Sequence, residues 1–243
     1  PRPEVQLAAS VVSMVERAIH AEFYNQINIE LGMDEDEDYL AYVNDPELNE
    51  RVTWLGKMLG QEDKILATII FSMTETALLF SSFAVLKSFQ SNGYNLLPVI
   101  VRGTNQSAID EDQHGIISAE IINTYYRELG TKLVDDTVRY DAVKEAVQHA
   151  YEHECRIIDM AFLGETLNGV TRQDMKEFVK YRLNIYLERI QLPKMFDVKD
   201  CTIVGWFEKN TYSYKSVDFF TKGQGSEYES KWDSEGFIAA WRD

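Results

Sequence analysis

Glu75 is a single charged residue in the middle of a long apolar segment. No other residue between Ile65 and Leu86 carries a charge. An ionised carboxylate buried in such a segment is costly unless it is paired with a cation or bound to a metal. The position therefore leaves three interpretations: a protonated Glu75 with a raised pKa, an ion pair with Lys or Arg, or a metal ligand.

The pair Glu111 and His114 is the second chemical signal, because it has the spacing Glu-x-x-His. Residues three apart share one face of a helix, so both side chains can reach the same ion. The pattern is common by chance and gains meaning only beside Glu75. Some four-helix bundles build a dinuclear site from one Glu on each of two helices and Glu-x-x-His on each of the other two. Such carboxylate sites with two imidazoles suit Fe or Mn.

His20 is the best candidate for the second imidazole. Arg17 stands three positions before it and Glu16 four positions before it, so the pattern is out of step by one residue. In a regular α-helix the Glu16 side chain would lie about 40° away from the His20 side chain around the axis. Either the Arg17 guanidinium faces the carboxylates in place of a metal ion, or a local shift turns Arg17 outward and brings Glu16 in.

Tyr24 follows His20 by one turn on the same helix face. A buried Tyr next to a His is most often a hydrogen-bonded core residue. The alternative is a phenol that is oxidised beside a metal ion.

His149, Glu152 and His153 form the pattern H-x-x-E-H, which zinc metalloproteases use. A protease would also need a distant third ligand and a sheet as a platform, and the sequence offers no strand-rich segment. Glu154 and Arg156 lie in the same stretch, so we interpret it as a solvated, charge-paired helix face rather than a zinc site.

Long helices must position these residues, because the chain has only 5 Pro and 13 Gly in 243 residues. Apolar residues recur at helical spacing, and we expect the third long helix to be interrupted at Gly103 and Gly115. Five consecutive acids at residues 34–38 indicate a solvated loop or a helix start. The expected helices are 4–31, 46–59, 61–92, 98–129, 136–163 and 171–190, followed by a short helical piece at 204–209.

The composition excludes several classes of protein. Lys and Arg number 24 against 40 Asp and Glu, and a net charge of −16 argues against a nucleic-acid partner. Six hydroxyl residues and Glu75 argue against a membrane span at 65–86. Two cysteines form no disulfide framework and the start has no signal-peptide pattern, so we expect a cytoplasmic protein without membrane association. The sequence begins at Pro1 without a Met, which is consistent with a piece of a longer protein.

Three segments together resemble the small subunit of class I ribonucleotide reductase: AIHAEFY (18–24), TETALLFSSFA (74–84) and IDEDQHGI (109–116). The segment 167–193 is similar to the last core helix of that family. The resemblance implies an all-α, ferritin-like bundle of long helices. We assign the bundle to residues 1–208 and a flexible C-terminal tail to residues 209–243.

The resemblance also implies a site. It is a dinuclear Fe and/or Mn centre that reacts with oxygen and oxidises a tyrosine to a radical. Tyr24 matches the radical position, and Asp110 matches the acid that hydrogen-bonds the first-helix His and links the site to the radical path. Phe83 matches an apolar pocket residue beside the radical. The residues that match metal ligands are His20, Glu75, Glu111 and His114, with Glu16 as a doubtful fifth.

The implied activity requires a second, different subunit. The radical passes to a separate large subunit, which reduces ribonucleotides to deoxyribonucleotides for DNA replication. The tail, with Tyr212, Tyr214 and Tyr228, would dock on that subunit, and the resemblance also implies a homodimer.

Two departures from the family keep alternatives open. Arg17 stands where the family has a bridging Glu, and the helix that carries the family's first carboxylate would precede Pro1. The chain could thus be a metal-free or metal-poor variant with Arg17 replacing a ligand, or an inactive scaffold for a catalytic partner. Another ferritin-like di-iron oxidase is a third alternative. If Arg17 replaces a metal, Arg17→Glu should raise metal occupancy.

Overall fold

The chain begins with one long helical rod in which a π-helical turn interrupts the α-helix. Residues 2–164 and 166–212 are the part of the chain that this computed structural model describes. The rod ends where Gly32 adopts a φ of +67°, as a glycine after a helix commonly does. The elements of this N-terminal part are α1 (Pro3–Val15), η1 (Glu16–His20), α2 (Ala21–Glu30), α3 (Asp36–Tyr39), η2 (Ala41–Asn44) and α4 (Pro46–Gly60).

Two long helices form the centre of the molecule, and the first again contains a π-helical turn. The expected interruptions at Gly103 and Gly115 are wrong, because the second helix runs through both. Both glycines instead allow close approach: a Cβ at Gly103 would lie 2.0 Å from the Phe23 ring, and one at Gly115 would lie 2.2 Å from Thr76 Oγ1. The elements are α5 (Lys64–Met73), η3 (Thr74–Leu78), α6 (Leu79–Ser88) and α7 (Pro98–Glu128).

The described C-terminal part adds three α-helices, a short 3-10 helix and one small hairpin, in which Thr166 pairs with Thr171. Thr171 also begins α9, since its side chain accepts a hydrogen bond from the backbone N–H of Asp174. The last helix extends through Tyr212, past the predicted start of the tail, and residues 213–243 lie outside the described residues. The elements are η4 (Leu133–Asp135), α8 (Thr137–Ala161), β1 (Thr166–Leu167), β2 (Val170–Thr171), α9 (Arg172–Arg189) and α10 (Thr202–Tyr212).

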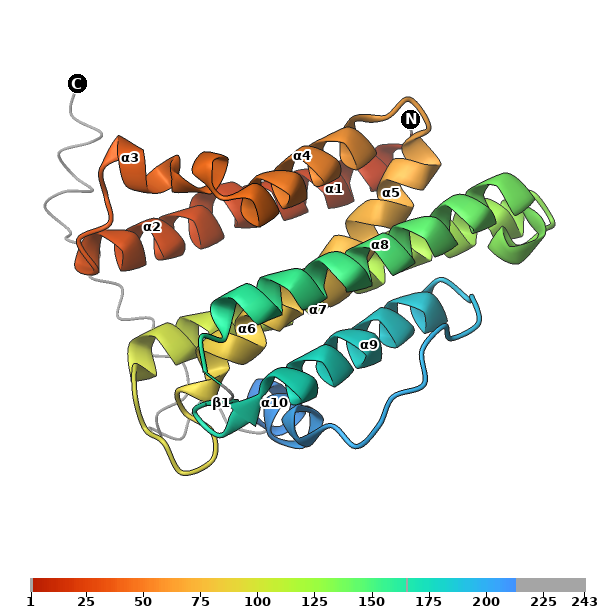
Figure 1. Cartoon of the computed structure of the whole chain (residues 1–243). Helices are drawn as coiled ribbons and strands as arrows, with labels where there is room; N and C mark the ends of the chain where they lie inside the picture. Colours follow the sequence, from red (N-terminus) through yellow and green to blue (C-terminus); the bar gives the residue numbers. More distant parts are fainter. Residues whose placement is uncertain (1, 165, 213–243) are drawn as a thin grey trace, which may run out of the picture.

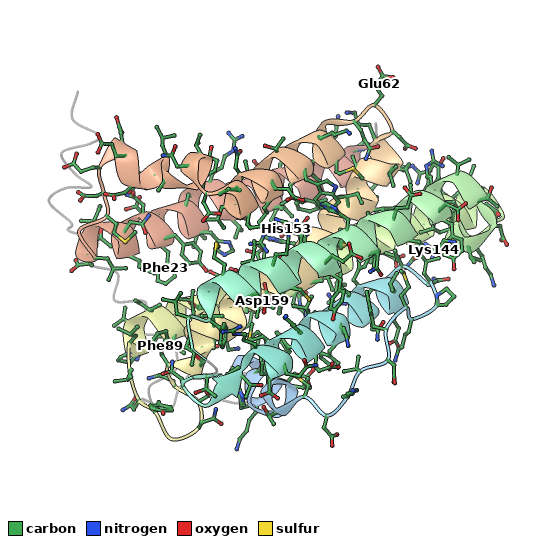
Figure 2. The ribbon with its side chains drawn as sticks, viewed as in Figure 1. Phe23, Glu62, Phe89, Lys144, His153 and Asp159 are labelled. Atoms are coloured by element: carbon green, nitrogen blue, oxygen red, sulfur yellow. The ribbon has the colours of Figure 1, made fainter. Side chains whose placement is uncertain are left out.

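The helices form the all-α bundle that the sequence predicts (Figure 1). Segments α1 to α4 lie on one side of α5 to α8, and α9 and α10 lie on the other. His153 of α8 faces α4, where its Nε2 donates to the Glu47 carbonyl at 2.9 Å (Figure 2). This arrangement leaves the middle helices buried from both sides.

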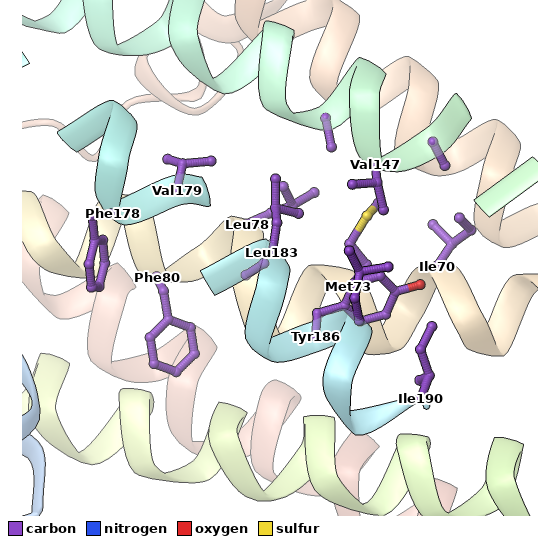
Figure 3. Packing of buried hydrophobic residues seen from close by; sticks show 14 of the residues in the cluster. Ile70, Met73, Leu78, Phe80, Val147, Phe178, Val179, Leu183, Tyr186 and Ile190 are labelled. Carbon is purple, nitrogen blue, oxygen red and sulfur yellow. The ribbon is translucent and has the colours of Figure 1, made fainter. Parts of the chain in front are cut away.

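The apolar core extends through the bundle, and one part of it lies between α5, α8 and α9. Met73, Val147 and Tyr186 meet there, and all three are fully buried (Figure 3). The helix from Lys64 to Ser88 is long and apolar enough to cross a membrane, but 67% of its most apolar window is buried inside the protein. The apolar composition of this helix therefore reflects its position in the core of the bundle.

Candidate metal centre

The π-helical turn η1 determines which side chains of the first rod face the bundle. A π-turn holds one more residue than an α-turn, so residues four apart within it take up a relation like that of residues three apart in an α-helix. Oε1 of Glu16 accordingly lies 3.1 Å from Nδ1 of His20. Arg17 is exposed and lines a surface depression with Ala9 and Met14. Of the two arrangements that the sequence left open, the structure has the local shift with Glu16 inside.

Four side chains from three helical segments meet beside His20. Glu16 comes from η1, Glu75 from η3, and both Glu111 and His114 from α7. One ligand atom from each of these four lies within 4.8 Å of the others. Nδ1 of His114 lies 3.1 Å from Glu75 Oε2, 2.8 Å from Glu111 Oε2 and 3.4 Å from Glu16 Oε1.

His20 joins this group from the opposite side. Its Nδ1 lies 3.0 Å from Oε1 of Glu111, and its ring centroid lies 6.5 Å from that of His114. The two imidazoles therefore flank the carboxylates, and Glu111 contacts both rings. All four family-matched ligands and Glu16 come together in one cluster, in which Glu16 is half-buried and the other four residues are buried.

The pKa values of Glu75 and Glu111 shift in opposite directions. Burial and the neighbouring Glu111 raise the pKa of Glu75 to about 8, although His114 opposes the shift. Burial also disfavours the charge on Glu111, but hydrogen bonds with His114 and His20 hold its pKa well below its ordinary range. At neutral pH Glu75 therefore favours its protonated form, whereas Glu111 favours its ionised form.

The imidazoles in turn favour their protonated forms. Burial lowers the pKa of His20, but the carboxylates of Asp110 and Glu111 outweigh it and raise the pKa to about 12. Burial likewise opposes the charge on His114, whose pKa rises to about 9 because of Glu111 and Glu75.

The donor set fits a metal centre. Glu16 Oε1 and His20 Nδ1 are buried, and neither has a hydrogen bond of good geometry within the described part of the chain. Three carboxylates and two imidazoles are the ligand chemistry of oxygen-rich Fe and Mn sites. The cluster could therefore hold a metal ion, and its residue types do not decide between Fe and Mn.

Asp110 connects the buried cluster to the surface. Its Oδ2 lies 3.1 Å from Nε2 of His20, the ring nitrogen that points away from the cluster. Its own side chain is 40% exposed. A ligand His whose second nitrogen is held by a carboxylate is a recurring feature of metal sites, because the contact fixes the ring orientation.

Tyr24 lies on the same rod, next to the cluster. It lines a cavity of about 400 Å³ together with Glu16, His20, Phe83 and Leu86. Burial raises the pKa of the Tyr24 phenol, while nearby Ser107 lowers it. Phe83 is buried at this cavity, so the phenol faces both the cluster and an apolar wall.

The H-x-x-E-H histidines occupy a different place. The rings of His149 and His153 stack with centroids 6.1 Å apart, and His149 also contacts the Trp54 ring at 4.6 Å. Glu47 and Glu50 lie beside them, but Arg156 pairs with both carboxylates at 2.7 and 2.8 Å. This surface is a charge-paired contact between α4 and α8.

Sequence reasoning missed the residues behind the cluster. Arg182 and Arg189 of α9 both reach Asp112, which directly follows Glu111. The available signal was the spacing of the two arginines, which are seven residues apart and so share one face of a helix. It could not be interpreted without knowing which helix α9 contacts.

The comparison with known families covers the whole of this site. No curated protein sequence matches the chain. The family model described as ribonucleotide reductase, small chain, matches residues 1–202, which include η1, η3, α7 and α9. Since the match spans most of the chain and every residue of the cluster, the chain belongs to the ribonucleotide reductase small chain family.

Proposed function

We propose that this chain is the radical-generating small subunit of a class I ribonucleotide reductase. Membership of the family supports a role in ribonucleotide reduction. The observation that carries the proposal is the meeting of Glu16, Glu75, Glu111 and His114 within 4.8 Å, with His20 beside them. These five residues would hold a dinuclear Fe and/or Mn centre. When bound, such a centre supplies, with oxygen, the one-electron oxidant for a nearby phenol.

Tyr24 would store the oxidising equivalent. Its hydroxyl is buried next to the cluster, and Leu79, Phe83 and Leu86 line the cavity that it faces. An apolar wall excludes water and reductants, which prolongs the lifetime of an oxidised phenol. The raised pKa keeps the resting phenol protonated, so its oxidation must release a proton.

His20 and Asp110 would connect the stored equivalent to a partner. The His20 ring has one nitrogen at the cluster and the other at Asp110, 3.1 Å away. Asp110 can hold the proton at Nε2 while an electron moves past the ring. Because Asp110 is partly exposed, it would begin a path toward a docked large subunit.

The remaining parts of the proposal follow from the family rather than from the cluster. The partner is the ribonucleotide reductase large subunit, bound through residues of the C-terminal segment 209–243. The chain forms a homodimer and works in the cytoplasm. The metal-poor alternative has less support, because the Arg17 side chain is exposed and Glu16 takes the inward position.

Metal content and radical formation test the proposal together. The full chain is loaded anaerobically with Fe(II) or Mn(II), desalted, analysed for metal and then exposed to oxygen. We expect up to two metal ions per chain and an electron paramagnetic resonance signal from a tyrosyl radical that disappears in Tyr24→Phe. Absence of transition metal after loading would contradict the proposal.

A further inference from the structure

Two arginines of α9 lie directly behind the metal centre. Arg182 is almost fully buried, with 3% of its side chain exposed, and Arg189 is 20% exposed. Both contact Thr76 and Asp112, which are the sequence neighbours of Glu75 and Glu111.

Thr76 lies within the π-helical turn that carries Glu75. A π-turn shifts the register of the backbone hydrogen bonds, so carbonyls at the shift need other donors. Nε of Arg182 donates to the Thr76 carbonyl at 2.9 Å, and Nη1 of Arg189 donates to Thr76 Oγ1 at 3.3 Å. The arginines therefore bind both the backbone and the side chain of this turn.

Asp112 provides the corresponding contact on α7. Its Oδ1 accepts from Arg189 Nη2 at 2.6 Å and from Arg182 Nη2 at 3.4 Å. Arg189 Nη1 also lies 3.5 Å from the Asp112 carbonyl oxygen. A single guanidinium thus spans from the turn of Glu75 to the turn of Glu111, which a planar fork of donors can do and an ammonium cannot.

Gly115 makes room for this bridge. A Cβ at that position would lie 2.2 Å from Thr76 Oγ1 and 3.1 Å from Arg189 Nη1. The absence of a side chain there lets η3 and α7 approach closely enough for Arg189 to reach both. The glycine, the threonine and the arginine therefore form one interdependent contact.

We propose that Arg189, together with Arg182, is a positioning residue for the metal centre. The pair joins Thr76 to Asp112 and so fixes the Glu75 carboxylate relative to the Glu111 carboxylate. Outer contacts that orient ligand side chains commonly change metal affinity ten- to hundredfold. The inference rests on the proposed function, since it assigns the arginines to the same metal centre.

The test compares Arg189→Met, Arg189→Lys and Thr76→Val in the full chain. Mn(II) affinity is measured from the loss of the free-ion electron paramagnetic resonance signal. Hydrogen exchange of the backbone amides at 74–78 is measured in the metal-free protein. We expect Arg189→Met to weaken Mn(II) binding by roughly ten- to hundredfold and to speed exchange at 74–78. Arg189→Lys should recover only part of the affinity, because it restores the charge beside Asp112 without the bridge.

Arg139→Met is the matched control. Arg139 is 23% exposed and pairs with Asp63 and Asp136, neither of which is next to a cluster residue in the sequence. Its substitution therefore removes similar ion pairs away from the proposed ligands. The inference is overturned if Arg189→Met binds Mn(II) as the unaltered chain does, or if Arg139→Met weakens binding equally. If the unaltered chain binds Fe(II) but not Mn(II), the same variants are compared by elemental analysis of bound Fe. If it binds neither ion, the proposed function fails, and the exchange at 74–78 alone decides the inference: faster exchange supports it, and unchanged exchange overturns it.

Discussion

Nδ1 of His20 lies 3.1 Å from Oε1 of Glu16, four positions earlier on the same rod. In a regular α-helix the two side chains would lie about 40° apart around the axis. The π-helical turn η1 between them changes this offset. Its extra residue is absorbed locally, so α1 and α2 continue on either side as one rod. The metal-binding face of the rod therefore depends on a single additional residue.

Deletion of Ala18 tests this relationship. The exposed Ala18 lies inside η1, and removing it converts Glu-x-x-x-His into Glu-x-x-His. A regular α-helix then places both side chains on one face. We expect Mn(II) binding to stay within about threefold of the unaltered chain and far-ultraviolet circular dichroism to remain helical.

Deletion of Ala21 is the control for that variant. Ala21 is also exposed but follows the π-turn, so its loss rotates everything after it by about 100° relative to His20. Tyr24 would leave the cavity, and the tyrosyl signal should vanish. Loss of metal binding in the Ala18 deletion alone would contradict the interpretation of η1.

The Glu16 side chain faces the cluster and the Arg17 side chain faces solvent, so substitutions at the two positions should affect metal affinity unequally. Glu16→Ala removes a carboxylate 3.4 Å from His114 Nδ1, and we expect at least a tenfold loss of metal affinity. Arg17→Ala removes an exposed side chain and should leave the affinity unchanged. Elemental analysis of both variants after loading measures the difference. Higher metal content in Arg17→Glu would instead indicate that Arg17 competes with the metal.

The sequence sufficed for the helices and for most of the cluster, because both depend on local spacing. Glu111 and His114 share a face in any α-helix, and a lone Glu75 in an apolar helix must be buried. The position of Glu16 could not be decided, since a π-turn depends on tertiary contacts that stabilise the extra residue. Gly103 and Gly115 were misjudged for a related reason: their function is to admit Phe23 and Thr76 from neighbouring helices.

Asp110 should affect radical transfer rather than metal uptake. Asp110→Asn keeps a hydrogen-bonding group 3.1 Å from His20 Nε2 but removes the negative charge that holds a proton there. We expect unchanged metal content and a Tyr24 signal within about twofold, with deoxyribonucleotide formation reduced at least about tenfold when the large subunit is added. A variant with equal activity would show that Asp110 takes no part in the transfer.

Lys87 should make the stability of the bundle depend on pH. Its side chain is fully buried, where Nζ donates to the Phe207 carbonyl at 3.2 Å and lies 3.5 Å above the Phe207 ring. Burial, with a smaller contribution from Arg182, lowers its pKa from 10.5 to about 7.

Between these two pH values the unfolded chain binds more protons at Lys87 than the folded chain does, so this residue makes stability rise with pH. Below about pH 7 both states are protonated and the full penalty remains, at most about 5 kcal/mol. Lys87→Met keeps the aliphatic stem and removes the charge. Its unfolding free energy in urea should therefore exceed that of the unaltered chain most at pH 7 and progressively less toward pH 10. The carbonyl of Phe207 also accepts from Thr211 Oγ1 at 2.8 Å, so the substitution leaves it a hydrogen bond. A constant difference between the two proteins from pH 7 to pH 10 would show that Lys87 stays charged in the core.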